Sequence, residues 1–132
     1  MSTNKATARI LIVEDDGIIA YSLRRLVQKL GYEVVGPVPS GKQAIQKAGE
    51  TNPDLVLMDI NLAGKLNGIE AAAQIQARSD IPVVYLSGYT EDILFQAGEI
   101  GEPYAYLGKP VYERELGDIL NKMLARHTPG TK

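Results

Sequence analysis

The sequence contains no cysteine, which excludes disulfide bonds and thiol catalysis and suits a reducing cytoplasm. It also has no apolar run approaching the roughly 20 residues of a membrane span. The opening residues, MSTNKATAR, lack the hydrophobic segment of a signal peptide. The net charge of −2 provides no overall basic field to attract nucleic acid or anionic lipid. We therefore expect a cytoplasmic protein that binds neither membranes nor nucleic acid directly.

What is present is an ordinary globular composition. The 132 residues are 45% apolar, enough for one domain with a single sizeable core. The ends of the chain are polar and resemble tails that fray. We predict an N-terminal tail over residues 1–7, a folded domain over 8–126 and a C-terminal tail over 127–132. The one histidine, His127, falls in the second tail and is expected to be inert.

Short apolar runs alternate with helical patterns along the chain. The runs are too short for typical helices and mostly lack period-two alternation, as in strands that are buried on both faces of a parallel sheet. They are RILIV, EVVG, DLVLM, PVVYL and YAYL. The intervening segments carry apolar residues at helical spacing, with helix-start signals at Ser40, Asn67 and Thr90.

Five strand–helix repeats predict a parallel sheet with right-handed crossovers. At this length the leading candidate is a flavodoxin-like, doubly wound α/β fold with strand order 2-1-3-4-5 and five flanking helices.

Charged and hydroxyl residues follow four of the five predicted strands, where ligands bind in open α/β sheets. They are Glu14, Asp15 and Asp16 after the first run, Asp59 after the third, Ser87 after the fourth and Lys109 after the fifth. The predicted strand order makes these four strands neighbours, so we expect their ends to meet. The second run is followed by only Gly36 and Pro37, as expected of an edge strand.

Carboxylates that meet at the ends of neighbouring strands must protonate, separate or hold a cation. A hard divalent ion such as Mg²⁺ is the natural occupant, because it takes one or two carboxylates together with waters and a phosphate oxygen. Beside such an ion, Asp59 could attack phosphorus to give an acyl phosphate. Lys109 would neutralise charge on the transferred group, and the Ser87 hydroxyl would hydrogen bond to it.

These residues resemble the receiver domains of two-component response regulators over approximately residues 8–126. The matching blocks occur in order and at the right spacing: ILIVEDD, LVLMDINLAGKLNGIEAA, IPVVYLSGYT and YAYLGKP. The resemblance implies a magnesium-dependent signalling domain whose Asp59 accepts phosphate from a histidine kinase or phosphotransfer protein. Such a domain catalyses its own phosphorylation and dephosphorylation and has no external substrate.

The resemblance also implies individual roles. Glu14 and Asp15 would be the acidic pair that holds Mg²⁺, or Mn²⁺ in its place, with Asp15 the direct ligand of the two. Asp59 and the backbone carbonyl of Asn61 would be further ligands. Ser87 and Tyr106 would be the switch residues. The resemblance further implies that the Lys109–Pro110 peptide bond is cis. A partner protein or output domain would bind through the face formed by helix 4, strand 5 and helix 5, and a homodimer is left open.

Three features depart from the common family pattern. Glu14 stands where aspartate is frequent, and we expect it to act through water. Val111 replaces the usual phenylalanine after the Lys–Pro pair, which puts the packing of the output face in question. The loop over residues 61–68 is longer than in the commonest members, so its path is open.

Other functions and simpler roles compete with this interpretation. An aspartate-nucleophile phosphatase needs a second acid two residues after the nucleophile, where this chain has Asn61. A flavin- or nucleotide-binding module needs a phosphate cradle after the first strand, where EDDG would repel phosphate. A degenerate receiver would bind partners without phosphorylation. Asp16 could simply cap the first helix, and Gly64 and Gly68 could be turn formers.

Overall fold

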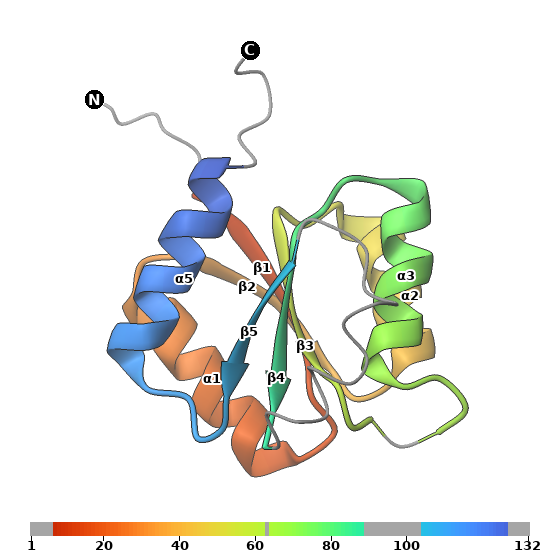
Figure 1. Cartoon of the computed structure of the whole chain (residues 1–132), viewed down its shortest axis with the longest axis horizontal. Helices are drawn as coiled ribbons and strands as arrows, with labels where there is room; N and C mark the ends of the chain where they lie inside the picture. Colours follow the sequence, from red (N-terminus) through yellow and green to blue (C-terminus); the bar gives the residue numbers. More distant parts are fainter. Residues whose placement is uncertain (1–6, 63, 89–103, 127–132) are drawn as a thin grey trace.

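A five-stranded parallel sheet lies between two layers of helices (Figure 1). The computed structural model describes residues 7–62, 64–88 and 104–126. The strand order is β2-β1-β3-β4-β5, which confirms the predicted doubly wound topology. The strands are β1 (Arg9–Val13), β2 (Glu33–Val38), β3 (Leu55–Asp59), β4 (Val83–Ser87) and β5 (Tyr104–Gly108).

The helices cover both faces of the sheet. One face packs against α1 (Gly17–Lys29) and α5 (Glu113–Arg126), and the other packs against α2 (Gly41–Thr51) and α3 (Gly68–Arg78) (Figure 1). These are four of the five predicted helices. The predicted helix that starts at Thr90 lies outside the described residues. None of the helices in the described ranges combines the length and the apolar character needed to cross a bilayer.

The apolar strands pack into two core clusters because successive side chains of a strand point to opposite faces. From β1, Leu11 and Val13 contact the cluster beneath α2 and α3, whereas Ile10 and Ile12 contact the cluster beneath α1 and α5. All four side chains are fully buried. The continuous apolar runs therefore mark strands covered on both faces, as predicted.

Side chains outside the core fix where the helices start. Asp16 caps α1 by accepting hydrogen bonds from the Ile18 and Ile19 backbone N–H groups at 2.9 and 3.0 Å. Its predicted capping role is thereby confirmed. Asn67 and Glu70 form a reciprocal capping box at the start of α3. This cap sets the end of the loop that follows Asp59.

The second strand extends further than predicted. It continues through Gly36 and Pro37 to Val38, with a cis Gly36–Pro37 bond and a shift of register against β1. Proline is tolerated here because β2 is an edge strand and the missing N–H leaves no ladder bond unmade. The extension matters for the site, since the Val38 carbonyl accepts a hydrogen bond from the Glu14 N–H at 3.0 Å.

Candidate functional site

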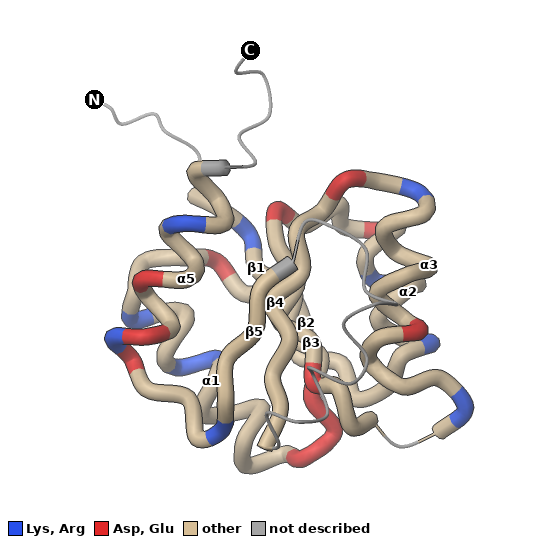
Figure 2. Tube along the Cα trace, viewed as in Figure 1, with Lys and Arg blue, Asp and Glu red and all other residues tan. Residues whose placement is uncertain are grey.

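The predicted site residues gather at the carboxyl ends of β1, β3 and β5. Because the sheet is parallel, with β1 next to β3 and only β4 between β3 and β5, side chains that follow these strands share one edge of the sheet. Figure 2 shows acidic residues concentrated at this edge, beyond β1 and at the end of β3.

Three carboxylates form the centre of the site. Oxygen atoms of Glu14, Asp15 and Asp59 all lie within 4.8 Å of one another. The side chains of Glu14 and Asp59 are buried, whereas Asp15 is exposed. Since burying unpaired like charges is unfavourable, the arrangement needs a nearby positive charge.

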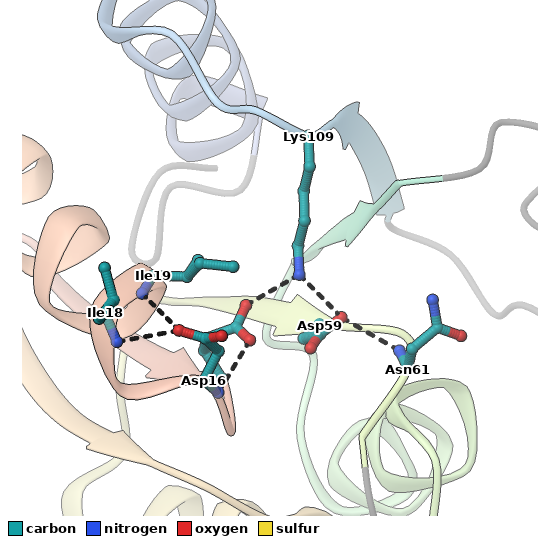
Figure 3. Close-up of polar contacts among 7 residues, drawn as sticks. Asp16, Ile18, Ile19, Asp59, Asn61 and Lys109 are labelled. Atoms are coloured by element: carbon teal, nitrogen blue, oxygen red, sulfur yellow. Dashed lines mark hydrogen bonds and ion pairs between the residues drawn. The ribbon is translucent and has the colours of Figure 1, made fainter.

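Lys109 provides that charge from the end of β5. Its Nζ atom lies 3.0 Å from Glu14 Oε1 and 3.3 Å from Asp59 Oδ1 (Figure 3). The lysine thus bridges two buried carboxylates that are far apart in the sequence. The Lys109–Pro110 bond is cis, as the sequence resemblance implied.

Burial and charge shift the pKa values of this pair. Burial raises the pKa of the Glu14 carboxyl to about 6, against the opposing effects of the Lys109 hydrogen bond and the Asp16 N–H. Burial would lower the pKa of the Lys109 amine, but contacts with Glu14 and Asp59 outweigh it and raise that pKa.

The raised pKa of Glu14 predicts pH-dependent stability in EDTA. Its folded value of about 6 exceeds the ordinary 4.5, so the folded state binds more protons than the unfolded state between these values. This contribution is therefore present at low pH and is lost as the pH rises through 6. We expect wild type to gain about 1 kcal/mol of unfolding free energy from pH 7 to pH 5, relative to Glu14→Gln. Urea denaturation at both pH values measures this difference, and an identical pH dependence in the two proteins would contradict it.

The carboxylate of Asp59 is oriented by two donors in the described part of the chain. Lys109 and the Asn61 backbone N–H, at 3.1 Å, both contact Oδ1. The Asn61 side chain points away from Asp59 (Figure 3). Asn61 therefore contributes its backbone here, and the position of its carbonyl as a cation ligand stays a prediction.

The two predicted switch residues lie on adjacent strands. Ser87 ends β4 and is 1% exposed, and its backbone carbonyl accepts the Lys109 N–H at 2.8 Å. Tyr106 pairs with Tyr85 across β4 and β5, and the residue is 39% exposed. Their positions are compatible with the predicted roles, which depend on a second conformation.

Gly68 has a role that the sequence did not reveal. We predicted a turn former, and for Gly64, with a φ of +102°, the backbone fits that prediction. Gly68, in contrast, does not have a positive φ. Instead, it is the first residue of α3 and lies against the backbone of Asp59, where a Cβ atom would overlap the Asp59 carbonyl. Its N–H donates to the Ile60 carbonyl at 3.0 Å, which closes the loop that follows Asp59.

Val111 packs on the same side of the sheet as α1 and α5. It is partly buried against the cluster that contains Leu116 and Leu120. The smaller residue therefore joins the core at the start of α5. Within the described residues, the question of how Val111 packs is therefore answered by its contact with this cluster.

Comparisons with known proteins agree with this architecture. The chain matches the response regulator receiver domain family over residues 10–121. The transcriptional regulatory protein PdtaR of Mycobacterium tuberculosis is 34% identical over 102 residues, which cover 77% of this chain and 49% of PdtaR. The phyllosphere-induced regulator PhyR of Methylorubrum extorquens is 33% identical over 116 residues, covering 87% of this chain and 43% of PhyR. The chain thus spans about half the length of the curated relatives it matches.

A solved structure shows the same fold at similar identity. It is the receiver domain of the sensor histidine kinase PA1611 from Pseudomonas aeruginosa, with a magnesium ion coordinated in its active site cleft. The TM-score is 0.80 at 30% identity, over 91% of this chain and 99% of that one. With the sheet order, the ordered sequence blocks and the family match in agreement, this chain belongs to the response regulator receiver domain family.

Proposed function

We propose that this receiver domain accepts a phosphoryl group on Asp59 and thereby switches a protein-binding surface. The observation that carries the proposal is the convergence of Glu14, Asp15 and Lys109 on Asp59. A carboxylate beside an acidic cluster and an ammonium has both a nucleophile and the charges needed to balance a phosphoryl group.

The residues present fit a divalent cation. The three clustered carboxylates supply hard oxygen ligands of the kind Mg²⁺ prefers. Asp15, the exposed member, would be a direct ligand, Glu14 would act through water, and the Asn61 carbonyl would complete the protein ligands. When bound, the ion would supply positive charge beside the phosphoryl oxygens.

The contacts of Asp59 support different tasks for its two carboxylate oxygens. Lys109 and the Asn61 N–H both contact Oδ1, so Oδ2 would be the atom that attacks phosphorus. The new Oδ2–P bond forms as the bond from phosphorus to the donor nitrogen of a phosphohistidine breaks. Lys109 would then pair with a phosphoryl oxygen, and the Ser87 hydroxyl would hydrogen bond to another.

The donor would be a histidine kinase or a phosphotransfer protein. On phosphorylation Ser87 would move toward the phosphoryl group, and Tyr106 would turn into the space that Ser87 leaves. These movements would bias the surface that includes β5 and α5 between two states, and a partner or output domain would read the result. The adjacency of β4 and β5 supports this coupling.

The rival functions fit the site less well. Asn61 supplies no proton for a phosphatase, and its side chain points away from Asp59 (Figure 3). The loop after β1 carries two carboxylates into the cluster, which disfavours direct phosphate binding there. A degenerate receiver would not need the buried pairing of Asp59 with Lys109.

Labelling with a small acyl phosphate tests the proposal. We expect base-labile, hydroxylamine-sensitive incorporation with Mg²⁺, and at least about a hundredfold slower incorporation in EDTA, because the charge on the transferred group is then less balanced. Mn²⁺ is expected to restore it. Incorporation that proceeds equally in EDTA, or a product that resists hydroxylamine, would argue against an aspartyl phosphate formed in a cation site.

A further inference from the structure

Lys109 lies closer to Glu14 than to Asp59. The two Nζ–oxygen distances are 3.0 and 3.3 Å, and the Glu14 and Asp59 side chains are only 1% and 3% exposed. The ammonium thus already balances two of the three carboxylates that would hold a divalent cation. A cation that enters this cluster must compete with a positive charge of the protein itself.

Glu14 is positioned to hold the lysine. Its Oε1 atom contacts Lys109, and its Oε2 atom accepts the Asp16 backbone N–H at 3.2 Å. Two hydrogen bonds in different directions orient the carboxylate. An aspartate at position 14 would be one methylene shorter and would withdraw from the amine.

We propose that Glu14 is a positioning residue that clamps Lys109 in the cation-free protein. The ammonium competes with the divalent cation for the cluster, and cation binding releases Lys109 from Glu14 so that its amine becomes available to phosphoryl oxygens. The clamp rests on the cation site of the proposed function. It adds a coupling between that site and Lys109, which depends on the length of the Glu14 side chain.

Cation affinity tests the competition without any phosphorylation. Lys109→Met removes the positive charge that contacts Glu14 and Asp59 and keeps an unbranched apolar side chain. We expect its dissociation constants for Mg²⁺ and Mn²⁺, measured by calorimetry on the full chain, to fall at least about tenfold. Lys122→Met is the matched control, because it makes the same charge change at an exposed position in the C-terminal half of α5. The C-terminal end of α5 lies far from the carboxyl ends of the strands (Figure 1).

Reactivity of the Lys109 amine tests the clamp itself. In wild type, saturating Mg²⁺ should increase acylation of Lys109 by an amine-reactive ester at least about threefold, since the charge-assisted bond to Glu14 is lost. Glu14→Asp should show the faster labelling already in EDTA. Glu33→Asp, an exposed position on β2, provides the same chemical change away from the site and should label like wild type. Mass spectrometry of the Lys109 peptide gives the rates.

The outcomes separate the clamp from the proposed function. Absence of Mg²⁺ binding by wild type would contradict both. Mg²⁺ binding with the same affinity in Lys109→Met and Lys122→Met would leave the cation site standing and overturn the clamp. Wild-type Lys109 labelling that does not change on addition of Mg²⁺ would also overturn the clamp. This result does not depend on the folding of any variant.

Discussion

Asp59→Asn should reduce phosphoryl incorporation from a small phosphodonor with Mg²⁺ by at least about a hundredfold, because the amide lacks the nucleophilic carboxylate oxygen. The substitution keeps the size of the side chain and an oxygen that can accept hydrogen bonds from Lys109 and the Asn61 N–H. A loss of incorporation therefore reports on chemistry. Time courses of radiolabelled phosphate, quantified per chain, provide the measurement.

Asp54→Asn is the matched control for this prediction. Asp54 precedes β3, whereas Asp59 ends it, so the same change is made at opposite ends of one strand. The Asp54 side chain accepts the Arg9 backbone N–H at 2.8 Å, which an asparagine oxygen can also do. Incorporation by Asp54→Asn should match wild type. Equal labelling of all three proteins would remove Asp59 from the role proposed for it.

Gly68→Ala is expected to destabilise the domain by about 3 kcal/mol, because the new methyl group would force α3 away from the Asp59 backbone. The start of α3 and the end of β3 are joined through the Gly68 N–H and the Ile60 carbonyl, so the overlap cannot be relieved by one side chain alone. Urea denaturation followed by circular dichroism measures the loss.

Gly49→Ala makes the same chemical change where no contact opposes it. Gly49 lies inside α2, and a Cβ atom there meets nothing within 4 Å. Alanine is the better helix former by up to about 1 kcal/mol, so this variant should be equally stable or more stable than wild type. If Gly68→Ala and Gly49→Ala changed the free energy of unfolding by the same amount, the close approach of α3 to Asp59 would not explain the need for glycine at position 68.

Much of the fold could be predicted because its determinants are local. Continuous apolar runs indicate strands that are buried on both faces, and the Asn67–Glu70 capping box is visible as a four-residue pattern. The polar residues at the strand ends also predicted that their side chains would meet at one edge of the sheet. Because β1 and β3 are parallel neighbours and only β4 separates β3 from β5, the residues that follow these strands must converge.

The missed features depend on how distant segments approach one another. The sequence cannot show that α3 starts against the backbone of Asp59, so the requirement for Gly68 appeared only as a turn preference. Nor could it show that Glu14 and Lys109, 95 residues apart, are in contact. The extension of β2 to Val38 was missed for a different reason. Gly36 and Pro37 normally end a strand, and an edge position is what allows them inside one.

We propose that the carboxylate of Asp59, and no other side chain, carries the phosphoryl group. Borohydride reduces an aspartyl phosphate to homoserine, so digestion and mass spectrometry of reduced protein identify the modified residue. We expect homoserine at position 59 only after incubation with phosphodonor and Mg²⁺. Phosphoryl incorporation with homoserine at another aspartate, or with phosphate retained on a serine, tyrosine or histidine, would contradict it.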